Sequence, residues 1–249
     1  MRKNLLILGL LITTLFCIKN SVYSQQAVNI DNKLNKSYSE IISNNLESAE
    51  KALEEVLKSD PNNINAHLYL GLIYHKKCVY DKALIEYFKV LQKDKNNLML
   101  NYNLGLLYQE MNSYQKALEF YLNVIKIKPD FPDVYFNVAR VYQELNTKDS
   151  KTINFYETYL KYKPEDLDAL NNLAVTYKTE GNYDKASEIF AKIIDIDPTY
   201  TPARYNMALM YLINNNQKEL EKEIKLLKKL SADHAKILDI QISKYNSNK

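Results

Sequence analysis

Apolar residues recur along this chain at the three- and four-residue spacing of amphipathic helices, and the pattern of paired helices itself repeats. The unit at 98–131 contains, in order, Leu104-Gly105, Tyr108, Ala117, Tyr121 and Pro129. The tyrosine near the end of each first helix returns at steps of 34, 34, 35 and 34 residues: Tyr74, Tyr108, Tyr142, Tyr177 and Tyr211. A fixed period of this length predicts stacked supersecondary units, each too small to bury its apolar side alone.

Five full repeats are predicted, at 64–97, 98–131, 132–166, 167–200 and 201–230. Each first helix carries a small residue where a close approach of its partner helix is expected: Gly71, Gly105, Ala139, Ala174 and Ala208. Glycine inside a helix lowers stability by about 0.5–1 kcal/mol relative to alanine, so a close helix crossing is the expected reason for it. Four large residues on the second helices are predicted to fill the hairpin interiors: Tyr87, Tyr121, Tyr156 and Phe190.

The two ends of the array are less regular. Residues 46–63 form a partial repeat, with a helix at Leu46–Ser59, whereas 25–45 is either a linker or a degenerate helix. At the other end, 231–249 is predicted to be a capping helix and tail. Its helix is expected at about 233–243, with Ile237, Leu238 and Ile240 on one side. Terminal units of a repeat array need a polar outer face, and the lysines of this end provide one.

At these positions the chain resembles the tetratricopeptide repeat (TPR) family, whose signature has an aromatic residue, Leu-Gly, Tyr, Ala, Phe or Tyr, and Pro. The resemblance implies an all-α fold, a right-handed α-solenoid of stacked antiparallel helix pairs. It also implies that the first helices line a concave groove.

Residues 1–24 have the pattern of a secretory signal peptide. Arg2 and Lys3 precede an apolar run from Leu5 to Ile18, and Val22-Tyr23-Ser24 offers a cleavage site after Ser24. An uncleaved membrane anchor is the alternative, but this run is shorter than the about 20 residues that a membrane span requires. We therefore expect an exported protein that is periplasmic or envelope-associated, or secreted where there is no outer membrane.

Removal of residues 1–24 leaves 30 basic and 30 acidic residues. A neutral chain with mixed charges lacks the basic patch that nucleic acids or anionic membranes attract, so neither is an expected partner and any membrane contact would be indirect. Cys78 would be the single remaining cysteine, which excludes an intramolecular disulfide; we expect a partly buried side chain.

Catalytic and metal-binding patterns are not found. The histidines are His67, His75 and His234; His75 lies three residues from Cys78, but no further metal ligand accompanies the pair. Four glycines in the whole chain exclude a glycine-rich phosphate loop. We expect no enzyme activity, no cofactor and no small-molecule substrate.

The resemblance places several polar and aromatic residues in the concave groove. Asparagine occupies the sixth position of four successive repeats: Asn103, Asn137, Asn172 and Asn206. Its amide both donates and accepts, and so can hold the main chain of an extended peptide; hydrogen bonds between helices are an equally favoured use. Apolar anchors are predicted at Tyr102, Phe136 and Tyr205, and polar determinants at Arg140, Gln109, Gln143 and Lys178.

Two functional classes therefore remain. One is an exported scaffold that binds a peptide or protein segment in the groove. The other is a structural subunit of an envelope assembly that uses its convex face or its ends, with the groove packed by its own N-terminal segment.

Overall fold

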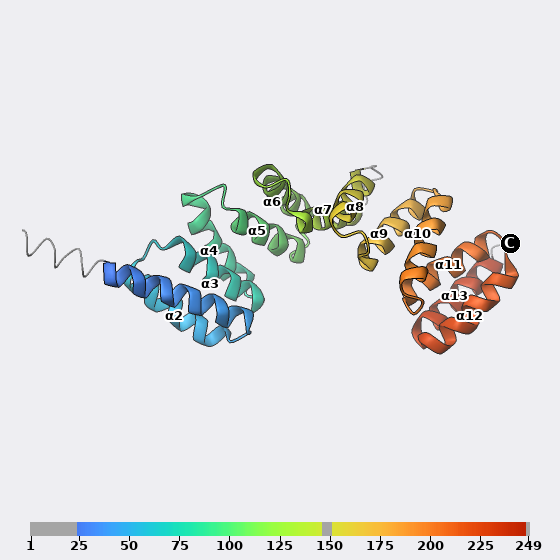
Figure 1. The fold of residues 1–249 in the computed structure, drawn as a ribbon, viewed down its shortest axis with the longest axis horizontal. Coiled ribbons are helices and arrows are strands. Elements are labelled where there is room, and N and C mark those ends of the chain that lie inside the picture. The colour runs from blue at the N-terminus through green and yellow to red at the C-terminus, as the bar shows by residue number, and fades with distance from the viewer. Residues whose placement is uncertain (1–23, 146–150, 248–249) are drawn as a thin grey trace, which may run out of the picture. The chain divides into compact units, whose positions relative to one another are not determined.

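The structure is a computed structural model that describes residues 24–145 and 151–247 (Figure 1). All regular secondary structure in these residues is helical. Residues 24–42 are helical, and the helices that follow are α2 (Leu46–Ser59), α3 (Ile64–Lys76), α4 (Tyr80–Lys93), α5 (Leu98–Glu110), α6 (Tyr114–Ile127), α7 (Pro132–Glu144), α8 (Lys151–Tyr162), α9 (Leu167–Thr179), α10 (Tyr183–Ile196), α11 (Thr201–Ile213), α12 (Gln217–Leu230) and α13 (Ala232–Ser247). The predicted signal peptide lies outside the described residues, apart from Ser24.

The chain divides into two compact units, and the division falls within α5. Unit 1 ends at Leu107 and unit 2 begins at Tyr108. In unit 2 the repeats share one continuous core: buried residues from α7 to α11, such as Ala139, Phe190 and Met207, form a single cluster. Consecutive hairpins therefore bury each other's apolar sides, as the period predicts.

Residues 24–42, where the sequence left a linker or a helix open, take the place of the first helix of a further hairpin. Leu34 and Ile41 are buried in one cluster with Leu53 of α2 and Ile73 of α3. Ser37 is fully buried at the position where later repeats carry Gly or Ala. A small hydroxyl residue thus replaces glycine at this crossing, and its Oγ donates 2.8 Å to the carbonyl of Lys33 in its own helix.

A left-handed residue marks the turn between the two helices of a hairpin. Positive φ occurs at the fifteenth position of the repeat in each case: Asn44, Cys78, Asn112, Gly181 and Asn215. Glycine and asparagine reach this region most readily, so Cys78 is the unusual member. The expectation for Cys78 was wrong: its side chain, in the turn between the two helices, is exposed.

The expected filling of the hairpin interiors is confirmed. The four large residues of the second helices are all fully buried: Tyr87, Tyr121, Tyr156 and Phe190. Gly71 lies directly against Tyr87, since a Cβ built on Gly71 would stand 2.4 Å from the tyrosine ring. Close approach, rather than backbone conformation, explains this glycine.

The last helix caps unit 2 with a different face from the one predicted. Leu238 and Ala235 of α13 are buried with Leu212, Leu220 and Leu227. Ile237 and Ile240, expected beside Leu238, are each 47% exposed. The core-facing stripe therefore runs through Ala235, Leu238 and Ile242, which follow the three- and four-residue spacing of one helical face.

Candidate functional site: the first-helix face of unit 2

The first helices of three consecutive repeats in unit 2 lie next to one another and are joined by side-chain hydrogen bonds. Gln143 of α7 bonds to Thr176 of α9, and Lys178 of α9 bonds to Asn206 of α11. We call the residues at repeat positions 5, 6, 9 and 12 of these helices the first-helix face. They are Phe136, Asn137, Arg140 and Gln143 of α7, Asn171, Asn172, Val175 and Lys178 of α9, and Tyr205, Asn206, Leu209 and Leu212 of α11.

The predicted asparagines are less exposed than free ligand-binding groups would be. Asn137 and Asn206 are both 7% exposed, and Asn172 is half-buried. The Asn206 amide is engaged at both ends: Nδ2 donates 3.0 Å to the Pro202 carbonyl and Oδ1 accepts 2.6 Å from Lys178 Nζ. In this repeat, Asn206 therefore forms a hydrogen bond between helices, which is one of the two uses of asparagine that the sequence left open.

Two of the predicted polar determinants hold buried tyrosines. Gln109 Oε1 accepts 2.9 Å from the Tyr121 hydroxyl, and Gln143 Oε1 accepts from the Tyr156 hydroxyl. Burial raises the pKa of Tyr156, which therefore remains a neutral donor. Because the Gln143 amide also donates 2.9 Å to Thr176, this side chain joins three helices and mainly orients the face.

In the next repeat the pairing changes because the second helix carries Phe190, which has no hydroxyl group. Lys178 occupies the position of Gln109 and Gln143 and reaches forward to Asn206 instead. Its side chain is half-buried, and desolvation lowers the pKa of its ammonium group. A positive charge is thus held within the face.

The two predicted aromatic anchors of unit 2 have different surroundings. Phe136 is half-buried, with its ring centroid 5.8 Å from that of Tyr156 and 5.2 Å from that of Tyr159. The Arg140 guanidinium lies 6.0 Å from the centre of the Phe136 ring and remains exposed. Tyr205 instead packs beside His234 of the capping helix, with ring centroids 6.0 Å apart. Both anchors are therefore half-buried and packed against other aromatic side chains.

Two predicted residues, Tyr102 and Asn103, belong to α5 in unit 1. Tyr102 is half-buried, and Asn103 is 5% exposed. Asn103 Nδ2 is buried without a hydrogen-bond partner among the described residues. A buried amide donor in this state lowers stability by about 1–3 kcal/mol, so it calls for an explanation.

Sequence reasoning missed Asn171, which precedes Asn172 on α9. Asn171 Oδ1 is buried and, within the described part of the chain, accepts no hydrogen bond. The signal was present in the Asn171-Asn172 pair, since the fifth position of the neighbouring repeats carries an aromatic residue. Thr176, which receives the Gln143 bond, was also not singled out.

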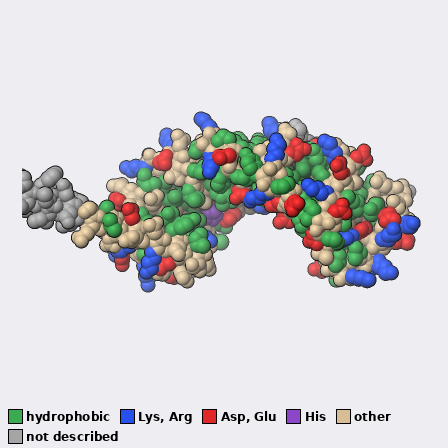
Figure 2. All heavy atoms as spheres, in the orientation of Figure 1, with side chains coloured by type: hydrophobic (Ala, Val, Ile, Leu, Met, Phe, Trp, Pro, Cys, Tyr) green, Lys and Arg blue, Asp and Glu red, His purple; other side chains and the backbone are tan. Residues whose placement is uncertain are grey.

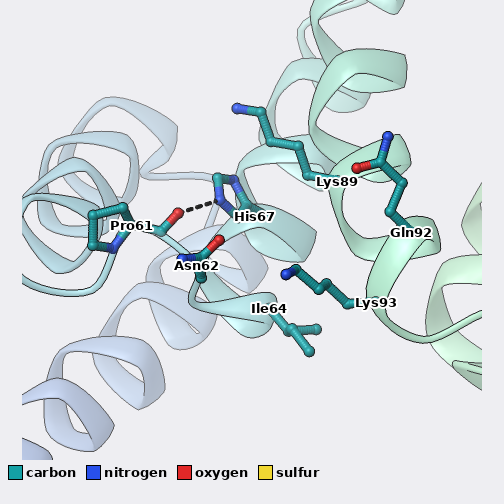
Figure 3. Close-up of a pocket in the computed structure, with 7 residues that line it drawn as sticks. All are labelled: Pro61, Asn62, Ile64, His67, Lys89, Gln92 and Lys93. Atoms are coloured by element: carbon teal, nitrogen blue, oxygen red, sulfur yellow. Dashed lines mark hydrogen bonds between the residues drawn. The ribbon is translucent and has the colours of Figure 1, made fainter.

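A separate pocket of about 340 Å³ lies in unit 1, between the turn before α3 and the helix α4 (Figure 3). His67 forms one wall, and its Nε2 lies 3.0 Å from the Pro61 carbonyl oxygen. Lys89, Gln92 and Lys93 form the other wall. Lys89 is paired with Glu86 at 2.8 Å, and its side chain is exposed. This pocket is therefore a solvent-exposed recess beside the contact between His67 and Pro61.

Other kinds of site are not found within 24–145 and 151–247. No three His, Cys, Asp or Glu side chains gather there in a group that could hold a metal ion. None of the helices in those residues has the length and apolar content to cross a membrane. Basic and acidic side chains are interspersed over the visible surface (Figure 2).

Comparison with known families agrees with the repeat pattern. Three models, each described as tetratricopeptide repeat, match residues 39–97, 100–131 and 150–209, and together they cover more than half of the chain. The chain belongs to the tetratricopeptide repeat family. The match from residue 39 takes in part of the degenerate first hairpin. No curated protein matches the chain.

Several solved TPR structures share the fold. PilF of Pseudomonas aeruginosa superimposes with a TM-score of 0.73 at 17% identity, over 87% of this chain and 99% of PilF. A TPR protein from Parabacteroides merdae gives 0.69 at 21% identity, over 88% of this chain and 87% of its own. YrrB, described as a TPR protein with an unusual peptide-binding site, gives 0.68 at 17% identity, over 78% and 99%. At these identities the likeness concerns the fold alone.

Proposed function

We propose that this TPR protein is an exported scaffold that binds an extended peptide or protein segment on the first-helix face. The observation that carries the proposal is that half-buried polar and apolar side chains, Asn171, Asn172 and Val175, lie together on that face. An asparagine amide can both donate to and accept from the main chain of an extended segment.

Hydrogen bonds alone do not provide the binding energy. Each contributes about 1 kcal/mol net, whereas association costs on the order of 4–15 kcal/mol. Half-buried apolar side chains on the same face supply the remainder: Phe136, Val175 and Leu209. The expected ligand is therefore an extended segment with apolar side chains, bound with about micromolar affinity.

The second candidate function is that of a structural subunit of an envelope assembly, which contacts its partners through surfaces other than the first-helix face. Ile237 and Ile240 of α13 are each 47% exposed, and Ile85 of α4 is 57% exposed. Apolar side chains of this size on outer faces are candidates for contact with another protein.

Site-specific photocrosslinking in living cells of the native host separates the two functions. A photoreactive phenylalanine analogue replaces Val175 on the first-helix face, or Ile85 or Ile237 on the outer surfaces. The proposal predicts discrete adducts from position 175 that disappear when Asn171 and Asn172 are both changed to Ala. Adducts from positions 85 or 237 alone would support the structural subunit and contradict segment binding.

Export needs its own measurement. We expect deletion of residues 1–24 to move the protein from the envelope or the medium to the cytoplasm. Fractionation of the same cells, with the full-length and the shortened protein, measures this change. A full-length protein found only in the cytoplasm would refute export. Segment binding would then still be decided by the crosslinking experiment.

A further inference from the structure

Lys178 places a half-buried positive charge on the first-helix face without a carboxylate to neutralise it. Its Nζ donates 2.6 Å to the neutral amide oxygen of Asn206. Among the described residues, Lys178 forms no ion pair with a carboxylate. An ammonium group in such a place has lost part of its hydration and has gained only one neutral acceptor.

Two other buried or half-buried cations among the described residues are neutralised by carboxylates. Arg204, at 8% exposed, lies 3.1 Å from both carboxylate oxygens of Glu223. Lys77 is paired with Glu50 at 2.7 Å and with Glu47 at 3.2 Å. Lys178 therefore differs from these two cations, because it has no carboxylate partner.

Two acidic residues near the starts of the first helices have partners of their own. Asp133, near the start of α7, is paired with Lys163 at 2.7 Å. Asp168, near the start of α9, accepts 2.7 Å from the Tyr200 hydroxyl. Arg140 adds a second, exposed cation to the face, one repeat before Lys178. The first-helix face as defined thus contains two cations, Arg140 and Lys178, and no carboxylate.

We propose that the segment bound on the first-helix face carries an acidic side chain, Asp or Glu, whose carboxylate binds Lys178 Nζ beside Asn206. This inference rests on the proposed function and adds the chemical class of its ligand. The carboxylate accepts hydrogen bonds from the ammonium group, which has three donors and uses one for Asn206. Arg140 favours a second acidic or polar residue earlier along the same segment.

The test uses an array of peptides that are about twelve residues long, which extend to roughly 40 Å. All are acetylated and amidated, so that no chain terminus carries a charge, and a parallel set of the same peptides keeps a free carboxyl terminus. The peptides form matched pairs of apolar and polar sequences that differ only in Glu against Gln at one central position. The purified full chain without residues 1–24 is applied at low salt, where exposed charges act most strongly.

The expected result is that Glu members bind at least about five-fold more tightly than their Gln partners. Lys178→Gln should abolish this preference, so that the Glu and Gln members of each pair bind equally to the variant. Glutamine is a conservative replacement here, because Gln109 and Gln143 occupy the same repeat position in the two preceding repeats. Lys161→Gln, an equal change of charge at an exposed site on α8, should keep the preference.

The contradicting outcomes are distinct. If peptides bind but Glu and Gln members bind equally, the acidic ligand is refuted and the proposed function stands. If Lys161→Gln removes the preference as well, general charge attraction explains it and Lys178 has no special role. If only peptides with a free carboxyl terminus bind, the side-chain assignment is wrong. If no peptide binds, the proposed function itself fails.

Discussion

His67 and Arg204 make the same two contacts in repeats that lie far apart in the sequence. The ring nitrogens of His67 lie 3.0 Å from the Pro61 carbonyl oxygen and 2.6 Å from Glu86 Oε2. Arg204 donates to the carbonyl of Pro198 and to both carboxylate oxygens of Glu223. In both cases the carbonyl lies six residues before the side chain and the glutamate nineteen residues after it. The fourth position of these repeats therefore ties the preceding turn to the second helix.

Replacing His67 tests this equivalence. His67→Leu removes both contacts and leaves the Pro61 carbonyl and Glu86 with fewer partners, so we expect a loss of about 1–3 kcal/mol in the stability of unit 1. His67→Arg should retain most of the stability, because Arg204 shows that arginine fits this position. Urea unfolding followed by circular dichroism measures both. Equal losses for the two variants would contradict the shared role.

Gly71→Ala should destabilise unit 1 through overpacking. The new methyl group would stand 2.4 Å from the Tyr87 ring, which is fully buried. The expected loss is about 1–3 kcal/mol. In the double variant with Tyr87→Leu, the Gly71→Ala change should cost much less, because the ring that it strikes is absent. The same cost in both backgrounds would show that Tyr87 is not the limiting neighbour.

Cys78→Asn should stabilise the α3–α4 hairpin. Cys78 has a φ of 57°, a conformation that costs most residues about 1–2 kcal/mol and that asparagine reaches more readily. We expect a gain of about 0.5–1 kcal/mol, measured as a higher midpoint of thermal unfolding. The reverse change at the equivalent turn residue, Asn112→Cys, should lower the midpoint. A change of the same sign in both variants would argue against the backbone explanation.

The contact between Lys77 and α2 should weaken in acid. Hydrogen bonding to Lys77 lowers the pKa of Glu50 below its ordinary value of 4.5, and the same bond raises the pKa of Lys77 above 10.5. A lowered carboxyl pKa contributes stability that is fully present above pH 4.5 and is lost as the pH falls through the folded-state value. A raised lysine pKa contributes stability below 10.5 that is lost as the pH rises through the folded-state value.

Lys77→Gln should therefore destabilise unit 1 at neutral pH and have a smaller effect at low pH, where Glu50 is protonated. Hydrogen exchange of the α2 and α3 amides at both pH values measures the difference. Lys76→Gln is the matched control, since Lys76 is exposed on the same turn and pairs with no carboxylate of the described residues. A Lys77 effect that does not depend on pH would refute the ion-pair origin.

The repeat boundaries were predictable because helix pairs of one length must meet at the same small and large positions. Gly71 and Tyr87 were identified from spacing alone, and the structure places them in contact. The first hairpin was harder to recognise, since Ser37 stands where the pattern has Gly or Ala. The αL turn residues give a clearer signal in retrospect: Asn44 stands 34 residues before Cys78, at the same turn position.

The candidate site was only partly predictable. The sequence placed Gln143 and Lys178 on the first helices, but it did not show that Gln143 holds Tyr156 or that Lys178 reaches Asn206. These pairings depend on whether the partner helix presents a hydroxyl group or Phe190. The unsatisfied amide of Asn171 likewise follows from what surrounds it, which spacing does not report.

The sequence by itself determined the hairpin architecture, because a 34-residue period of small and large apolar residues can be buried only by stacking like units. Tertiary structure decided which polar groups on the first helices are already occupied and which are not. Lys178 and Gln143, for example, bond to residues of the following repeat that lie 28 and 33 residues away in the sequence. The local sequence pattern therefore determines where a side chain lies on its helix. The packing of the next helix determines which hydrogen bonds that side chain forms.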